Sequence, residues 1–537
     1  MICTLSVAES RKRKMPHVTR IWGPPGTGKT TYLLNSVQKE LVLGRRPDRI
    51  GYYAFTRAAA NEAINRALTM FPTYTRDDLA HFRTIHSECF KLLGLTRETV
   101  LNSKALAEFA KAYNYRFSSP RDDYQQREEL IITTQDDMLL FFEEWRRAKC
   151  ISDLSQAYGA FYSVHPYDCP VLAAFIKFHQ RYTSFKIDKR LYDFTDMLAS
   201  VVHRGLTPEI DVMFVDEAQD LNPLEFMIVE LWSRGCQSVY ICGDPLQAIY
   251  VFQGAEPKLF FSMQADEDKT IVQSHRVPKV SHKLSMLLAQ RTVVGKRLEY
   301  LPTSETGFVA WKGNVSHVKL HDELSYFILA RNRTFLEPVE KMLLNSNVPF
   351  RNLRGLDPFK SNLSKAIKGG LLLAEHKKTP IEYAVSLFCE YTPSKPWLKH
   401  GAKTKLTQLA KDFPGATLGY EQLSSYTLYS IWDKIYDGSW WGVLKVQEED
   451  RQYFKRLIAS RGVEILDKKP NVTLGTIHSV KGAECDITIC LSDMTRRTYQ
   501  SYCADPEREI PVWYVAVTRN KKGLYIIEHE ASGYFDW

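Results

Sequence analysis

A glycine-rich turn near the start of the chain has the spacing of a phosphate-binding loop. Residues 23–30 read Gly-Pro-Pro-Gly-Thr-Gly-Lys-Thr and fit the pattern G-x-x-x-x-G-K-[ST]. Glycines let successive backbone N–H groups turn toward phosphate oxygens at a helix N-terminus. Lys29 would reach the β- and γ-phosphates as a point charge, and the Thr30 hydroxyl would ligate Mg²⁺. The loop predicts a nucleoside triphosphate site.

Two adjacent carboxylates follow an apolar run in the middle of the chain. The run is Val212–Val215, and Asp216 and Glu217 come directly after it. At the carboxyl end of a strand they would stand where open α/β sheets bind ligands. Asp216 suits the Mg²⁺ shell, and Glu217 suits the base that orients and deprotonates an attacking water. Taken alone, the segment favours a solvated acidic turn; the phosphate-binding loop shifts the interpretation to a metal and base site.

Short apolar segments alternate with helical patterns and would position these groups. The loop lies between an expected strand at His17–Trp22 and an expected helix at Thr30–Leu43. Further strands are expected at Ile50–Phe55, Val212–Val215, Val239–Cys242, Tyr326–Ala330, Val472–Ile477, Ile487–Leu491 and Leu524–Ile527. Buried strands alternating with helices predict an α/β fold with parallel sheets covered on both faces.

Two stretches interrupt this alternation and are expected to be insertions into the sheet domains. Residues 95–185 are helical in pattern, and residues 355–465 mix Lys-rich, Pro-containing and aromatic segments. Trp432, Trp440 and Trp441 in the second stretch could form a base-stacking surface. The general preference of aromatic side chains for burial favours a small aromatic core instead.

Composition limits the class of protein. The chain has 537 residues, of which 44% are hydrophobic and 25% charged, so disordered, collagen-like and fibrous classes are excluded. No apolar run is long enough to span a membrane, and Met1–Arg20 lacks the apolar part of a secretory signal. The ten cysteines form no C-x-x-C pair, so we expect a cytosolic protein without zinc ribbons or disulfides. The net charge of +9 suits a polyanionic partner without requiring one.

The motifs of the chain, taken in order, resemble those of the superfamily 1 helicases of the UvrD/Rep/PcrA type. Beyond the loop and Asp216-Glu217-Ala218-Gln219, the matching segments are Tyr53–Ala60, Thr84–Ser87, Gly243–Ala255, Ser274–Arg276, Thr476–Glu484 and Tyr514–Arg519. They span residues 23–519, which is nearly the whole chain. The two expected insertions carry no such motif.

The resemblance implies two RecA-like P-loop domains with parallel sheets, each carrying an inserted, mainly helical or mixed subdomain. Domain 1A, which binds ATP, would comprise residues 1–94 and 186–270, with subdomain 1B at 95–185; domain 2A would comprise 271–354 and 466–537, with subdomain 2B at 355–465. ATP would lie in the cleft between the two RecA-like domains.

The resemblance also assigns residues to ATP and Mg²⁺. Gln247 would touch the γ-phosphate, Arg276 and Arg519 would act as arginine fingers, and Glu484 would contact the ribose. The catalytic set is Glu217, Lys29, Gln247, Arg276 and Arg519, and the metal set is Thr30 and Asp216. The nucleotide-binding set is Gly23, Pro24, Pro25, Gly26, Thr27, Gly28, Lys29, Thr30, Thr31, Gln247, His275, Arg276, Glu484 and Arg519.

A second set of motif positions implies a single-stranded DNA path. Phe55, Tyr250 and Phe252 would stack bases, which contributes about 1–3 kcal/mol per base regardless of sequence. The full set is Phe55, Thr56, Arg57, Thr84, His86, Tyr250, Phe252 and His478. Taken alone, each aromatic residue is equally compatible with core packing, and Thr56 and Arg57 with an ordinary helix start.

Departures from the family pattern concern the base of the nucleotide. Members usually place an adenine-reading glutamine about twenty residues before the loop, yet Met1–Arg20 contains none, and His275 stands where a stacking tyrosine is usual. We therefore expect relaxed selectivity among nucleoside triphosphates. Gln253, Ala483 and Cys485 also depart from the usual residues and are expected to tune activity.

The leading hypothesis is an ATP-dependent helicase that moves along single-stranded DNA and unwinds duplex DNA in replication, repair or recombination. The form of Thr476–Gly482 resembles the branch that moves 3′ to 5′. A DNA-remodelling or loading factor without robust unwinding and an RNA helicase stay open. A helicase–nuclease subunit is disfavoured, because only eighteen residues follow Arg519. We expect a monomer, and the short length for this family favours a phage or plasmid source.

Overall fold

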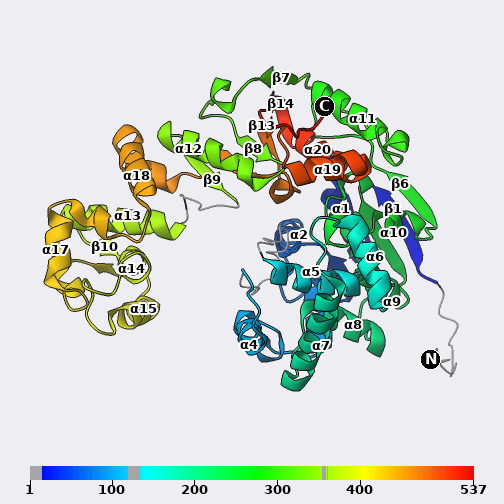
Figure 1. Ribbon diagram of the computed structural model, residues 1–537, viewed down its shortest axis with the longest axis horizontal. Helices are drawn as coiled ribbons and strands as arrows, with labels where there is room; N and C mark the ends of the chain where they lie inside the picture. Colours follow the sequence, from blue (N-terminus) through cyan, green and yellow to red (C-terminus); the bar gives the residue numbers. More distant parts are fainter. Residues whose placement is uncertain (1–14, 119–133, 354–358, 360) are drawn as a thin grey trace.

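The computed structural model describes residues 15–118, 134–353, 359 and 361–537, and its framework is a pair of six-stranded parallel sheets (Figure 1). The first sheet has the order β3 (Phe82–Arg83), β2 (Ile50–Tyr53), β4 (Val212–Val215), β5 (Ser238–Gly243), β1 (His17–Trp22) and β6 (Glu267–Thr270). The second has the order β7 (Phe308–Lys312), β14 (Asn520–Ile527), β13 (Cys485–Leu491), β8 (Tyr326–Ala330), β12 (Val472–Thr476) and β9 (Phe350–Asn352). The expected α/β fold with parallel sheets is confirmed.

Alternation within the central strands explains why their sequences are apolar throughout. In β4, Val212 and Phe214 belong to the core cluster under α1 (Lys29–Val42) and α2 (Arg57–Met70), whereas Met213 and Val215 belong to the cluster on the other face. The strand β8 divides its residues between two clusters in the same way. Successive side chains point to opposite faces of a strand, so a sheet covered on both sides needs apolar residues at every position.

Helices cover both sheets. Around the first sheet lie α3 (Ile85–Leu92), α8 (Phe194–Arg204), α9 (Pro223–Ser233) and α10 (Pro257–Ser262), together with α1 and α2. With the second sheet lie α11 (Lys279–Gln290), α12 (Glu337–Asn345), α19 (Arg496–Ala504) and α20 (Pro506–Val517). In Figure 1, α19 and α20 lie on the side of the second sheet that faces the first.

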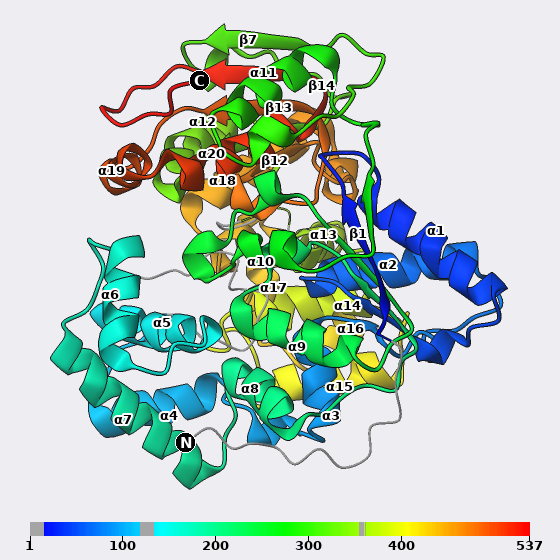
Figure 2. The ribbon, with the colours of Figure 1, turned by 90° about the vertical axis from the view of Figure 1, so that its right-hand side faces the viewer.

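The two stretches expected as insertions contain further helices. The first holds α4 (Ser103–Tyr113), α5 (Gln135–Ala148), α6 (Leu154–Val164) and α7 (Leu172–Lys189), which lie together in Figure 2. The second holds α13 (Ser361–Ala374), α14 (Ile381–Val385), α15 (Ala402–Asp412), α16 (Tyr420–Leu423), α17 (Tyr429–Tyr436) and α18 (Glu448–Arg461), with a small hairpin of β10 (Thr379–Pro380) and β11 (Thr417–Leu418). Figure 1 shows this second group set apart from the first sheet.

Two sequence expectations about these insertions are now settled. Trp432, Trp440 and Trp441 are buried in a core cluster, so the aromatic-core interpretation is confirmed and the stacking surface is excluded. The boundary drawn at residue 185 was wrong, because it cuts α7, which continues to Lys189. The boundary at 354 and 355 lies outside the described residues.

Buried charges attach the first insertion to the sheet beneath it. Arg147 on α5 donates to Asp193 at 2.5 Å and to Asp196 at 2.7 Å, and Lys186 on α7 also pairs with both carboxylates. Asp193 caps α8, which packs on the first sheet. Breaking one partner of a buried ion pair costs about 3–5 kcal/mol, so α5 and α7 are held firmly to the first sheet.

No helix among the described residues is long and apolar enough to cross a lipid bilayer.

Candidate active site and nucleic-acid interface

The phosphate-binding loop leaves β1 and ends where α1 begins at Lys29. Gly28 caps this helix with φ at 81°, a left-handed value that glycine adopts without steric cost. The Lys29 ammonium donates to the Gly23 carbonyl at 2.9 Å. Burial disfavours the Lys29 charge, but Glu217, Asp244 and Asp216 outweigh it and raise the Lys29 pKa. Lys29 therefore carries its full charge at neutral pH.

The loop touches the second half of the chain through Ser274–Arg276. The Ser274 hydroxyl donates to the Pro25 carbonyl at 2.8 Å, and the His275 N–H donates to the Gly26 carbonyl at 2.8 Å. A Cβ atom at Gly26 would lie 2.5 Å from the Arg276 Cβ, and φ there is 70°. Glycine at position 26 is therefore required both by the backbone and by the close approach of Arg276.

The carboxylate pair lies at the carboxyl end of β4, as expected, and faces the loop. The Thr30 hydroxyl donates to Asp216 Oδ2 at 3.0 Å. The Tyr52 hydroxyl donates to the same oxygen at 2.9 Å, a role for Tyr52 that the sequence analysis missed because the residue reads as an ordinary buried strand position. Burial and the charge of Glu217 raise the Asp216 pKa.

Glu217 has an unusual backbone for a residue other than glycine. Its φ is 55° and its ψ is 40°. A left-handed residue of this kind costs on the order of 1–3 kcal/mol and marks sites where the surrounding structure dictates a side-chain position. Burial alone would raise the Glu217 pKa, but the charges of Lys29 and Lys481 lower it below its ordinary value. Glu217 is therefore held as a carboxylate, as a base must be.

A chain of hydrogen bonds runs from Glu217 to the second sheet, and the sequence analysis assigned no role to its middle members. Gln219 Nε2 donates to Glu217 Oε2 at 2.5 Å and to Asp220 Oδ2 at 3.3 Å. Lys481 pairs with Asp220 and donates to the Gln247 carbonyl at 2.6 Å. Burial, only partly offset by Lys481, raises the Asp220 pKa to about 7.

The two expected arginine fingers both lie at the junction of the sheets. Arg519 is 1% exposed and donates to Gln247 Oε1 at 3.0 Å. Burial and then the neighbouring Arg276 lower the Arg519 pKa to about 9, so it stays charged at neutral pH. Arg276 Nε is buried and has no hydrogen-bond partner among the described residues. Glu484 Oε2 lies 4.0 Å from Arg276 Nη1. These residues come from separate motifs, and the fold brings them together.

This arrangement fits a magnesium-bound nucleoside triphosphate. The orphaned Arg276 nitrogen lies beside a loop with a charged lysine, and an anionic group would satisfy it. Mg²⁺ commonly uses one or two carboxylates together with phosphate oxygens. Thr30 and Asp216 supply that kind of set, and the described residues contain no group of three or more His, Cys, Asp or Glu that could hold a metal alone. Thr31 and His275 are exposed at the edge of the cleft.

The expected base-stacking aromatics cluster on one segment of the chain. The Phe55 and Tyr250 rings stack with centroids 5.2 Å apart, and Phe252 meets His478 edge-on at 5.6 Å. Phe55 and Phe252 are partly exposed, so each retains surface for a base. Tyr250 is 3% exposed and lies 5.1 Å from the Lys481 ammonium. In this conformation Tyr250 offers no face for stacking, and its expected role would require movement.

The other expected DNA-contacting residues are held mainly by their own helices. Thr56 and Thr84 cap α2 and α3, each accepting a hydrogen bond from a backbone N–H, which matches the alternative interpretation of Thr56 as a helix start. Arg57 is exposed at the start of α2. His86 is buried, with its Nδ1 atom 3.6 Å from Glu225 Oε1, and His478 is also buried. In this conformation these two histidines have little surface for a strand.

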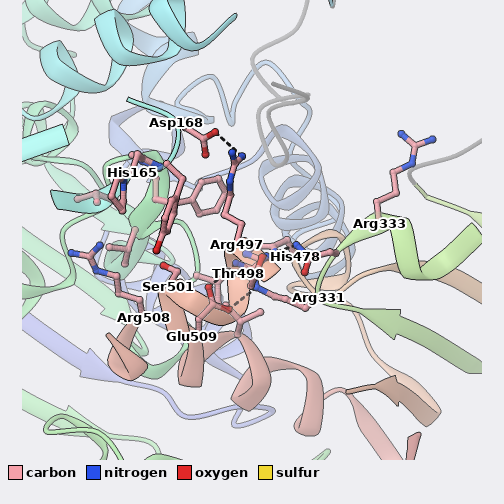
Figure 3. Close-up of a pocket in the computed structure, with 18 residues that line it drawn as sticks. His165, Asp168, Arg331, Arg333, His478, Arg497, Thr498, Ser501, Arg508 and Glu509 are labelled. Atoms are coloured by element: carbon pink, nitrogen blue, oxygen red, sulfur yellow. Dashed lines mark hydrogen bonds and ion pairs between the residues drawn. The ribbon is translucent and has the colours of Figure 1, made fainter. Parts of the chain in front are cut away.

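A cavity of about 440 Å³ adjoins Phe252 and His478 (Figure 3). Its walls come from the loop after α6, from Ile249–Phe252, and from the second sheet with α19 and α20. Arg331, Arg333, Arg497 and Arg508 line it. Arg331 forms a two-point ion pair with Glu509 at 2.6 and 2.8 Å. None of these arginines was assigned a role from the sequence, because they belong to no quoted motif.

Comparison with known proteins shows the family. A model of the UvrD/Rep helicase N-terminal domain matches residues 10–268, and a model of the UvrD-like helicase C-terminal domain matches residues 454–531. Together they cover more than half of the chain. The chain therefore belongs to the UvrD/Rep family of superfamily 1 helicases.

Individual relatives are distant. A probable DNA helicase of Mycoplasma pneumoniae is 24% identical over 46% of this chain and 48% of its own length, and a probable DNA helicase II homolog of the same organism is 22% identical over 96% and 82%. One component of an ATP-dependent helicase/nuclease of Carboxydothermus hydrogenoformans is 32% identical over 18% and 9%. The chain thus spans about half, or much less, of the length of several of these relatives.

Similarity to solved structures is weaker still. An arterivirus nonstructural protein 10 helicase aligns over 96% of this chain and 60% of its own, with 12% identity and a TM-score of 0.34. The family assignment therefore rests on the sequence models.

Proposed function

We propose that the chain is an ATP-dependent DNA helicase that moves 3′ to 5′ along single strands and unwinds duplex DNA. One observation carries the proposal: the groups needed for hydrolysis are divided between the two sheets and meet at one cleft, where Arg519 donates to Gln247 Oε1 at 3.0 Å. Lys29 and Glu217 come from the first sheet, and Arg276 comes from the segment leading to the second. A site divided in this way couples hydrolysis to relative movement of its halves.

Each residue then has a defined task. Glu217, held as a carboxylate by Lys29 and Lys481, orients and deprotonates the attacking water. Lys29, Arg276 and Arg519 neutralise charge on the phosphates, and an arginine finger contributes about 10³–10⁵ in rate in other P-loop enzymes. Thr30 and Asp216 would hold Mg²⁺, which supplies charge neutralisation when bound.

The moving bodies follow the division expected for the family. We propose domain 1A at residues 1–94 and 190–270, subdomain 1B at 95–189, domain 2A at 271–354 and 466–537, and subdomain 2B at 355–465. Ending subdomain 1B at residue 189 keeps α7 intact.

The segment from Gln247 to Phe252 supports coupling between the cleft and DNA. Gln247 contacts Arg519 at the cleft, and Phe252 lines the cavity beside His478. The intervening Ile249 and Tyr250 pack in the core cluster of the second sheet. A shift of the second sheet therefore moves the nucleotide contact and the DNA contact together, and stacking alone would hold a strand without giving it direction.

Unwinding assays on tailed duplexes test the proposal. With ATP and Mg²⁺, we expect displacement of a strand from a 3′-tailed DNA duplex, little from a 5′-tailed or blunt duplex, and none with K29A as the blank. Displacement only from the 5′-tailed duplex would refute the polarity. Stimulation of ATP turnover by single-stranded RNA but not DNA would favour the RNA helicase instead. DNA-stimulated turnover without displacement would favour a remodelling or loading factor.

We further propose relaxed selectivity for the base of the nucleotide. His275 is exposed at the edge of the cleft, and its backbone N–H is engaged with Gly26. A histidine in place of a stacking tyrosine offers the base a smaller ring. We expect GTP to compete with ATP within about tenfold of its own affinity, measured by inhibition of ATP turnover. A preference for ATP of more than about a hundredfold would refute this expectation.

A further inference from the structure

The cavity beside Phe252 contains an ion pair that joins two parts of the chain. Arg497 Nη1 on α19 lies 2.6 Å from Asp168 Oδ1, which belongs to the loop between α6 and α7. Figure 3 shows this pair on one side of the cavity and the Arg331–Glu509 pair on another. Asp168 thus links the inserted helices, which are attached to the first sheet, to a helix of the second sheet.

The arginines of the cavity have different partners. Arg331 is held by Glu509 on the adjoining helix, and Arg508 pairs with Asp505 within its own helix. These carboxylates come from the same half of the chain as the arginines. The carboxylate that contacts Arg497 comes instead from the opposite wall. Movement of the walls relative to each other therefore breaks the Arg497 pair and spares the others.

The Asp168 carboxylate is poorly suited to its surroundings. Burial raises the Asp168 pKa, and the Arg497 charge offsets this only in part. The Arg497 side chain is 60% exposed, and exposed ion pairs are weak. The same loop is tethered nearby through His165, whose Nε2 atom lies 3.2 Å from the Phe252 carbonyl. Asp168 is thus placed at the cavity by its loop, and the ion pair itself is easily exchanged.

We propose that Arg497 binds a backbone phosphate of the DNA strand and that Asp168 occupies Arg497 as an internal competitor until the strand enters. The inference rests on the proposed function, because it takes single-stranded DNA as the ligand. Phosphate oxygens and a carboxylate engage a guanidinium in the same way. Phe252, partly exposed on the same cavity, would hold a base while Arg497 holds the phosphate.

The competition predicts opposite effects of removing the two partners. D168N frees Arg497 and removes a negative charge from the strand path, so DNA binding should tighten by about two- to fivefold, the range expected for an exposed ion pair. R497Q removes a phosphate contact, so binding should weaken. The slope of log K against log salt concentration should also fall by about 0.7, the value for one phosphate contact on a single strand.

The experiment is a double-mutant cycle on the full chain. A fluorescent oligothymidylate is titrated by anisotropy at several salt concentrations with the unchanged chain, D168N, R497Q and the double variant, and thermal unfolding checks that each variant is folded. D322N is the matched control, because Asp322 pairs with Arg461 at 3.1 Å before the start of β8, at the opposite edge of the second sheet. D322N should leave DNA affinity unchanged.

The competition requires that D168N tighten binding more when Arg497 is present than in the R497Q background. Equal gains in both backgrounds would show only general repulsion between Asp168 and DNA and would overturn the inference. An unchanged salt slope in folded R497Q would overturn it as well. If the unchanged chain bound no DNA, the proposed function would fail too, so the two failures are distinguishable.

Discussion

Acidification is expected to loosen the contact between the inserted helices and the Phe252 segment through His165. The His165 ring packs against Phe161 with centroids 4.6 Å apart, and its Nε2 atom lies 3.2 Å from the Phe252 carbonyl. Because a carbonyl only accepts hydrogen bonds, Nε2 is the donor. Burial lowers the His165 pKa to about 4, although the hydrogen bond to Phe252 opposes the shift.

The sign and size of the effect follow from this pKa. Relative to an ordinary pKa of about 6.5, the unfolded chain binds the proton more readily than the folded chain between pH 6.5 and 4. The contribution of neutral His165 to the free energy of unfolding is therefore present above pH 6.5 and is lost as the pH falls. The loss is about 1.4 kcal/mol at pH 5.5 and at most about 3.4 kcal/mol below pH 4.

Two measurements check this expectation. Hydrogen–deuterium exchange at the His165 C2 position, followed by mass spectrometry over a pH series, reports the pKa of that ring. Urea unfolding at pH 7.5 and 5.5 reports the stability, with H165Q as the matched variant, because glutamine retains a donor but does not titrate. The unchanged chain should lose about 1.4 kcal/mol more than H165Q between these pH values. A measured pKa between 6 and 7, or equal losses in both proteins, would refute the reasoning.

Three further substitutions test the cleft and the DNA path. G26A should lower ATP turnover by at least about a hundredfold, because its Cβ would overlap Arg276, whereas G44A adds a similar left-handed strain with nothing within 4 Å and should retain turnover. E217Q should bind ATP and DNA but lose about 10²–10⁴ in turnover, and a rate equal to the unchanged chain would disprove its role as base. F252A should weaken single-stranded DNA binding by roughly 5- to 150-fold in anisotropy titrations, with Y429A, which removes an exposed tyrosine of α17, as control. Unchanged affinity in F252A would make Phe252 a core residue.

Burial explains which strands were predictable. Every strand expected from an apolar run is present, and most of these strands have neighbours on both sides in the sheets. The strands that were missed, β3, β6, β7 and β9, are the four sheet edges. The edge strand β6 reads Glu-Asp-Lys-Thr and is only partly buried. An edge strand pairs on one side only and can carry polar side chains, so its sequence lacks the apolar signal.

The same reasoning separates the predictable parts of the site from the rest. The phosphate-binding loop and the carboxylate pair were found from sequence because their chemistry depends on short, contiguous spacings. Tyr52, Gln219 and Lys481 were given no roles, although they contact or shift the charges of Asp216 and Glu217. Their side chains are ordinary for a strand or a turn, and only their neighbours make them functional.

The sequence by itself determined the α/β class, the central strands, the phosphate-binding loop and the family, because each depends on local spacing or on motifs read in order. The tertiary structure decided that Arg519 meets Gln247 and that Lys481 meets Asp220 across the junction of the sheets. It also decided that Tyr250 is covered and that Asp168 lies against Arg497. These outcomes depend on packing between segments hundreds of residues apart, where burial and charge are set by neighbours that local sequence does not specify.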